Sequence, residues 1–146
     1  MDINKSAPAI GEGEIQVAAP PERVWDVLSN IDGWPGWNRD VRSAKLEGPV
    51  AVGSVFRWRS GASSLVSTFQ VVDRPREIGW SGKTMGIEAL HVFRLEPEDG
   101  GTHVRSEESW DGLLARVLKG YSHKAIDRAL RNALTALKQE AERSAA

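Results

Sequence analysis

The C-terminal segment from Leu113 to about Glu142 constrains this chain most, because its apolar residues recur every three or four positions. That spacing places them on one side of an α-helix. Charged residues, among them Arg128, Arg131 and Lys138, fall mostly on the other side. Such a helix is about 40 Å long and cannot bury its apolar face alone. The rest of the chain must therefore present a wide, concave apolar surface. The apolar face consists of Leu114, Val117, Leu118, Tyr121, Ala125, Leu130, Ala133, Leu134, Leu137 and Ala141.

Length and charge narrow the classes of protein. The 146 residues suit one domain, with residues 1–10 as an irregular lead-in. A net charge of −1 gives no global electrostatic reason to bind nucleic acid or an anionic membrane. The absence of cysteine excludes disulfides, thiolate metal ligands and a cysteine nucleophile. The N-terminus lacks the pattern of a signal peptide, and no apolar run reaches the ~20 residues of a membrane span. We therefore expect a cytoplasmic protein without stable membrane insertion.

The first third of the chain predicts one strand followed by short helices. Glu12–Ala18 alternates apolar and polar residues and is typical of a strand. Pro20 and Pro21 end that strand and suit the first turn of a helix, which continues amphipathically to Ile31. The next stretch, residues 32–38, is a compact turn or a single helical turn that carries two tryptophans.

A period of two dominates from Val41 to Trp110, which predicts six further strands. The turns between them are short, so successive strands are expected to run antiparallel as a meander. We therefore predict an α+β fold in which a curved seven-stranded antiparallel sheet wraps round the long helix. Gly120 lies inside that helix, where it costs ~1 kcal/mol relative to alanine, and it marks either a bend or a close approach to the sheet. The six strands are expected at Val41–Leu46, Ser54–Arg59, Ser64–Val72, Glu77–Ser81, Gly86–Leu95 and Thr102–Trp110.

Several local motifs resemble those of a known superfamily. The segment Pro21–Leu28, followed by Trp34–Asn38, is similar to the entry motif of the polyketide cyclase/dehydrase-type (SRPBCC) branch of the START-like, or helix-grip, superfamily. The resemblance covers residues 11–142. It implies a helix-grip fold with two short helices between the first two strands. It also implies a cavity between sheet and helix that binds or acts on hydrophobic small molecules, including lipids. Further matching stretches are Gly53–Phe56, His91–Leu95, Gly101–Val104 and Glu107–Leu113.

His91 and Glu108 form the best acid–base pair that the sequence offers. Strand alternation places His91 on the same inward face as Phe93 and Leu95, and it places Glu108 in phase with Trp110. An imidazole in that position can act as a general acid or base. The alternative is a structural histidine held by a hydrogen bond, which we favour because buried titratable groups are often structural. A buried carboxylate needs a partner, and His91 on the neighbouring strand supplies one.

The aromatic residues are expected to line a ligand cavity. The chain has six tryptophans but only three phenylalanines and one tyrosine. Each one singly fits ordinary core packing, and we assign Trp25 to the core, but together they exceed what the core requires. Ligand pockets are mostly apolar and have few polar groups, as here. The expected ligand-binding residues are Trp34, Trp37, Trp58, Phe69, Trp80, His91, Phe93, Ser106, Trp110 and Tyr121.

Neither a metal nor a cofactor is expected. The three histidines, His91, His103 and His123, lack the spacing of metal ligands. The segment Gly11–Gly13 is a fragment of a dinucleotide-binding fingerprint, but it opens a strand and lacks the third glycine. No nucleophile elbow or phosphate-binding loop occurs.

Three functional hypotheses follow. The first is a carrier or sensor that binds a hydrophobic or aromatic small molecule. The second is an enzyme, a cofactor-independent cyclase, aromatase or dehydratase that uses His91 and Glu108. The third is a module that binds a partner through the basic face of the last helix, with Arg128 and Arg131. The identity of the ligand, turnover, the pathway and the formation of a homodimer are left open.

Overall fold

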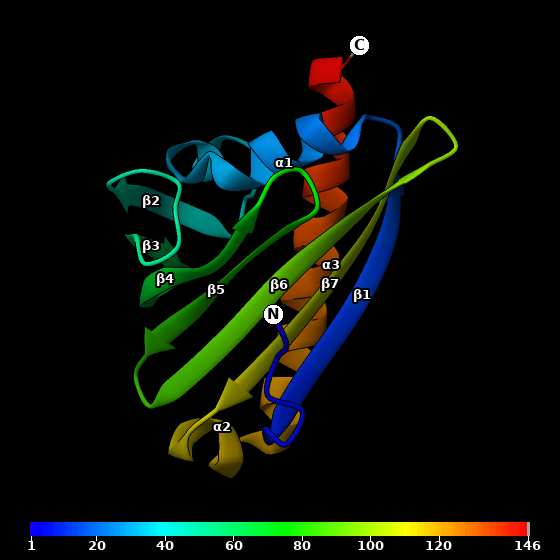
Figure 1. Cartoon of the computed structure of the whole chain (residues 1–146). Coiled ribbons are helices and arrows are strands. Elements are labelled where there is room, and N and C mark those ends of the chain that lie inside the picture. Colours follow the sequence, from blue (N-terminus) through cyan, green and yellow to red (C-terminus); the bar gives the residue numbers. More distant parts are fainter. Residues whose placement is uncertain (146) are drawn as a thin grey trace.

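One curved antiparallel sheet encloses a long helix (Figure 1). The computed structural model describes the backbone of residues 1–145 and the side chains of residues 1–143. Its seven strands are ordered β1-β7-β6-β5-β4-β3-β2, which confirms the predicted helix-grip fold. The strands are β1 (Ala9–Val17), β2 (Val41–Glu47), β3 (Val55–Ser60), β4 (Ser63–Asp73), β5 (Glu77–Thr84), β6 (Ile87–Glu98) and β7 (Gly101–Asp111). The helices are α1 (Pro21–Ser29), the short 3₁₀ helix η1 (Ile31–Gly36), α2 (Leu113–Val117) and α3 (Lys119–Ala145).

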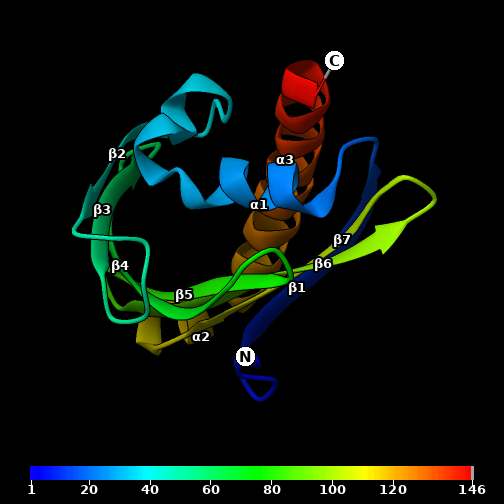
Figure 2. The same ribbon diagram turned by 45° about the horizontal axis from the view of Figure 1, so that its top comes forward.

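The sheet is a meander that one long-range pairing extends at its β7 edge. Strands β2 to β7 lie beside their neighbours in sequence, because their connections are too short for a crossover. Strand β1 pairs with β7 instead, with Ala9 opposite Trp110 and Val17 opposite Thr102. Figure 2 shows the resulting curve, with α1 lying across its open side and α3 along it.

Two glycines of β1 allow α3 to lie directly on that strand. A Cβ atom on Gly11 would lie 2.1 Å from Ile126 Cγ2, and one on Gly13 would lie 3.0 Å from Leu134 Cδ1. Of the two alternatives for Gly120, the close approach to the sheet is wrong, since no atom of another element lies within 4 Å of a Cβ placed there. The helix and the sheet therefore meet most closely through glycines of the strand.

The buried face of α3 faces β1 and α1. Leu130 and Leu134 are 3% and 4% exposed, so both predicted core positions of this helix are confirmed. The face continues through residues that are fully buried: Ile126, Leu137 and Ala141.

The first turns of the predicted helix differ from expectation. The helix is interrupted at Leu118, which has φ −105° and ψ 40°, so α2 and α3 are separate. Four residues assigned to the buried face are exposed. Leu114 and Val117 belong to α2, which follows the end of β7 (Figure 1), whereas Leu118 lies at the break and Tyr121 in the first turn of α3. Their exposed fractions are 38% for Leu114, 69% for Val117, 44% for Leu118 and 71% for Tyr121.

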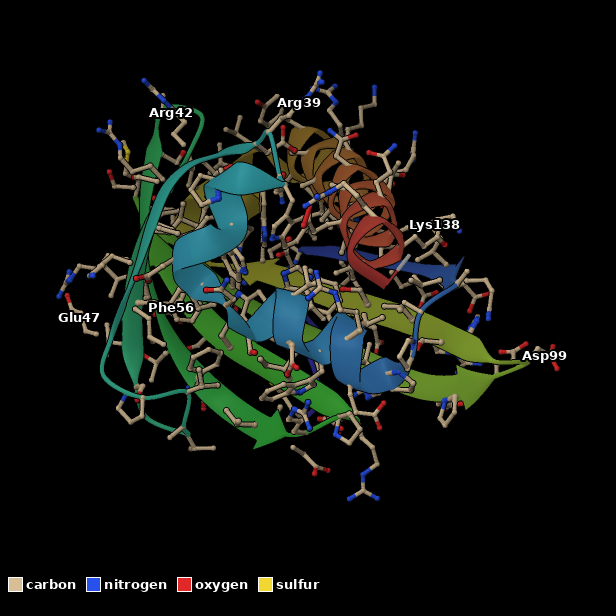
Figure 3. All side chains as sticks on the ribbon, turned by 90° about the horizontal axis from the view of Figure 1, so that it is seen from above. Arg39, Arg42, Glu47, Phe56, Asp99 and Lys138 are labelled. Carbon is tan, nitrogen blue, oxygen red and sulfur yellow. The ribbon has the colours of Figure 1, made fainter. Side chains whose placement is uncertain are left out.

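An aromatic core fills the space between the sheet and the short helices. Phe56 and Phe69 are fully buried, with ring centroids 5.0 Å apart. Trp34 from η1 packs edge-on against Phe56 at 5.5 Å. Trp25 is buried as predicted, and its indole N–H donates to the carbonyl of Glu77 at 3.2 Å. In Figure 3, Phe56 points inward, whereas Asp99 points away from the molecule.

Glu142 ties the end of α3 to the chain after β1, and this contact predicts a pH-dependent stability. The N–H of Ala18 donates to Glu142 Oε2 at 2.8 Å, and Lys138 Nζ lies beside the same oxygen. The hydrogen bond from Ala18, assisted by Lys138, holds the pKa of Glu142 below its ordinary value of 4.5. A depressed pKa in the folded state stabilises the protein above the ordinary value, and this contribution is lost as the pH falls through the lowered value.

We expect Glu142→Gln to be less stable than the wild type at pH 7 and equally stable once both are titrated at low pH. Urea unfolding at a series of pH values measures the difference in the free energy of unfolding. Glu96→Gln, at an exposed position of β6, is the matched control. A difference for Glu142→Gln that stays constant from pH 7 to pH 3 would contradict the expectation.

Candidate functional site

A cavity lies between the sheet and α3. It consists of a smaller pocket of about 80 Å³ beside η1 and a larger pocket of about 340 Å³ beside α2. We name these the inner and outer pockets. The two pockets are adjacent and share six lining residues, namely Trp58, Ser60, Trp80, His91, Glu108 and Ala129.

Small residues of α3 leave room for this cavity. Ala125, Ala129 and Ala133 recur every four positions and line the side of the helix that faces the pockets. Leu130 and Leu134 lie on the adjacent face, against β1. The helix thus packs against β1 through its large side chains, and its alanines leave space for the cavity.

Strand alternation supplies the opposite wall. Trp58 of β3, Trp80 of β5, His91 of β6 and Trp110 of β7 all face the cavity, as their parity predicts. Trp58 Nε1 donates to Ser67 Oγ at 3.0 Å. Its polar edge is thus satisfied within the protein, and the ring contributes apolar surface.

A chain of four hydrogen-bonding groups crosses the junction between the two pockets. His91 and Glu108 are directly opposite in the register of β6 and β7. His91 Nδ1 lies 3.0 Å from Glu108 Oε1, and His91 Nε2 lies 2.8 Å from Ser106 Oγ. Trp110 Nε1 donates to Glu108 Oε2 at 3.0 Å. Both ring nitrogens of His91 and both carboxylate oxygens of Glu108 therefore have partners.

The order serine, histidine, carboxylate resembles that of a hydrolytic triad, but the serine is not placed to attack a ligand. Ser106 is 1% exposed, and its hydroxyl donates to the carbonyl of Val92 at 3.1 Å. It lines neither the inner nor the outer pocket. In contrast, the side chains of His91 and Glu108 are 12% and 13% exposed and line both pockets. The part of this cluster that reaches the pockets is thus His91 with Glu108.

Eight of the ten ligand-binding residues expected from the sequence line the cavity. They are Trp34, Trp37, Trp58, Trp80, His91, Phe93, Trp110 and Tyr121. The other two lie elsewhere. Phe69 is fully buried in the core, where its ring packs against Phe56 and Trp80. Ser106 lies beside His91, away from the pockets.

The sequence also missed several residues of the cavity. Ala129 and Leu65 were not assigned to it, and Leu114 and Leu118 were assigned to the core although they line the outer pocket. The four-residue spacing of alanines on α3 was the signal that could have identified the helical wall. At the inner pocket, Asn132 Nδ2 of α3 donates to Asp40 Oδ2 at 3.3 Å, which links the helix to the loop before β2.

The other histidines lie outside the cavity. His103 Nε2 lies 3.3 Å from Glu14 Oε2, and His123 Nδ1 lies 3.2 Å from the carbonyl of Ile10. Among the residues that the structure describes, no group of three or more histidines and carboxylates is arranged to hold a metal ion. Within residues 1–145, no helix is both long and apolar enough to span a membrane.

Fold and cavity together define a helix-grip protein. The chain belongs to the family described as polyketide cyclase / dehydrase and lipid transport, whose model matches residues 9–142. A comparison with curated protein sequences finds no match.

Solved structures share the fold at low sequence identity. A hypothetical protein of Helicobacter pylori has a TM-score of 0.83 at 13% identity and covers 94% of this chain and 90% of its own. The Zhui aromatase/cyclase of a Streptomyces species has a TM-score of 0.78 at 18% identity, with coverages of 92% and 93%. A START superfamily protein of Mycobacterium smegmatis has a TM-score of 0.72 at 14% identity, with coverages of 92% and 97%.

Proposed function

We propose that this protein binds a hydrophobic or aromatic small molecule in the cavity between the sheet and α3, as a carrier or sensor. The observation that carries the proposal is the outer pocket of about 340 Å³, which is walled by Trp58, Trp80 and Trp110. Large, mostly apolar cavities with a few convergent polar groups are the usual form of small-molecule sites. Membership of a family described by cyclase, dehydrase and lipid-transport activities supports the same conclusion.

An enzyme is the second candidate, and the pair of His91 and Glu108 is the observation that favours it. The two side chains are 3.0 Å apart at the junction of the pockets. A histidine with a carboxylate partner can move a proton to or from a bound carbonyl compound. The reaction class would be a cyclase, aromatase or dehydratase, and the similarity to an aromatase/cyclase structure supports this choice.

Binding of the apolar fluorophore N-phenyl-1-naphthylamine tests the proposal. We expect saturable binding that quenches tryptophan emission, because the wall of the outer pocket contains three indole rings. Ala129→Trp should weaken the binding at least tenfold, because a large side chain at Ala129 projects into the space shared by both pockets. Arg128→Trp adds the same side chain at the neighbouring exposed position of α3 and should leave the affinity unchanged.

Two results separate the candidates. Mass spectrometry of the purified protein should detect a retained small molecule, and release of that molecule unchanged supports a carrier or sensor. Conversion of a polyketide-like carbonyl compound into product by the wild type, and not by Glu108→Gln, supports the enzyme. Absence of fluorophore binding, or equal binding by Ala129→Trp, would overturn the proposed site.

A further inference from the structure

The hydrogen bonds at the junction of the pockets leave His91 with no free polar atom. A histidine ring has two nitrogens, and each makes at most one hydrogen bond in the ring plane. Nδ1 is occupied by Glu108 and Nε2 by Ser106. Ser106 is itself fixed on the carbonyl of Val92. A ligand that used either nitrogen of His91 would have to displace one of these partners.

Glu108 retains capacity for further hydrogen bonds. A carboxylate is only an acceptor and offers about four lone-pair sites on its two oxygens. His91 Nδ1 occupies one site and Trp110 Nε1 a second. About two sites therefore remain, on a side chain that lines both pockets. Lone pairs of a half-buried carboxylate are costly to leave without a donor.

Two of the indole groups nearby donate to other acceptors. Trp34 Nε1 donates to the carbonyl of Leu28 at 3.0 Å, and Trp58 Nε1 donates to Ser67. The hydroxyl of Ser60, which also lines both pockets, can either donate or accept. A ligand carbonyl or ether oxygen at the junction would face the lone pairs of Glu108, which repel it, whereas a hydroxyl or N–H group would satisfy them.

We propose that the ligand is an apolar, largely aromatic molecule with a hydroxyl or N–H group at the end that lies in the junction, and that this group donates a hydrogen bond to Glu108. This inference rests on the proposed function, because it assigns the chemical class of the molecule held in the same cavity. From the sequence, His91 and not Glu108 was expected among the ligand-binding residues. In this proposal Glu108 contacts the ligand, and His91 and Trp110 hold the carboxylate in place.

Substituted trans-stilbenes test the proposal in the wild-type protein. The series consists of 4-hydroxystilbene, 4-methoxystilbene and 4-methylstilbene, which share the same flat apolar body. Only the first carries a donor, and the second keeps the oxygen without its hydrogen. We expect 4-hydroxystilbene to bind about tenfold more tightly than the other two, as is usual for a hydrogen bond to a charged group. The methoxy compound should bind no more tightly than the methyl compound, because its ether oxygen gains no hydrogen-bond donor and faces the lone pairs of Glu108.

A variant locates the acceptor. Glu108→Gln keeps the shape of the side chain but directs one amide N–H₂ group toward the cluster, so the preference for the hydroxyl compound should fall to about threefold or less. Glu88→Gln, the same change at an exposed position of β6, should keep the tenfold preference. Tryptophan quenching by each compound provides the dissociation constants.

The possible outcomes are distinct. Equal binding of all three stilbenes would overturn the inference and leave the proposed function intact. No binding of any stilbene or of N-phenyl-1-naphthylamine would overturn the proposed function itself. An undiminished hydroxyl preference in Glu108→Gln would place the acceptor at another group and so overturn the assignment to Glu108. The wild-type series decides the class of ligand even where Glu108→Gln does not fold.

Discussion

Replacing Leu134 with alanine is expected to lower the free energy of unfolding by about 2–5 kcal/mol. Leu134 is 4% exposed, and its Cδ1 atom lies against the backbone of β1, 3.0 Å from the point where a Cβ on Gly13 would be. The wall opposite the leucine is therefore backbone, which moves little to fill a cavity. The loss then includes both the transfer of the removed methyl groups and the unfilled space.

The control is the same substitution on the neighbouring helix. Leu113 of α2 is 76% exposed, so Leu113→Ala should change the free energy of unfolding by no more than about 0.5 kcal/mol. Urea titration followed by circular dichroism measures both variants. A similarly small loss for Leu134→Ala would mean that α3 does not pack on β1 as described here.

The strands could be predicted because their signal is local. Alternation of apolar and polar residues over a few positions identifies both a strand and its buried face. Thus Trp58, Trp80 and His91 were expected on the inner face, and they lie there. The pairing of β1 with β7 was not predicted. The alternation that includes Ile15 and Val17 indicates which side of the strand faces inward, but it does not indicate which strand lies beside it.

The long helix shows where periodicity misleads. Leu114, Val117 and Leu118 continue the spacing of the buried face, but burial also needs closely packed neighbours opposite each side chain, and these residues lack them. These residues are exposed, and two of them, Leu114 and Leu118, form part of the outer pocket. A helical pattern therefore predicts which residues share a face and leaves open what that face contacts.

Most residues of the candidate site were predictable from the sequence, but the hydrogen bonds between them were not. Parity brought His91 and Glu108 together, and the structure places them in contact. Ser106 and Trp110 determine which atoms of His91 and Glu108 already have a hydrogen-bond partner. Their positions depend on side-chain rotamers, which the periodicity of the sequence does not indicate. The division between an occupied histidine and an available carboxylate could come only from the three-dimensional arrangement.

Gly11 provides the second prediction of large effect, because its missing side chain lets α3 reach β1. Gly11→Ala should lower the free energy of unfolding by about 1–3 kcal/mol, as overpacking of a tight core does. The new Cβ would lie 2.1 Å from Ile126 Cγ2 and 3.0 Å from Leu130 Cδ1. In an extended strand alanine is otherwise no worse than glycine, whose greater freedom in the unfolded chain is unfavourable. Any loss would therefore come from contact with the helix.

A double-mutant cycle with Ile126→Ala identifies that contact. Ile126 is fully buried, so Ile126→Ala alone is expected to cost about 2–5 kcal/mol. In the Gly11→Ala background the same truncation removes the colliding Cγ2 atom, and the new methyl group fills part of the space. The double variant should therefore be more stable than the sum of the single losses predicts, by at least about 0.5 kcal/mol. Additive losses would show that α3 and β1 do not meet at Gly11.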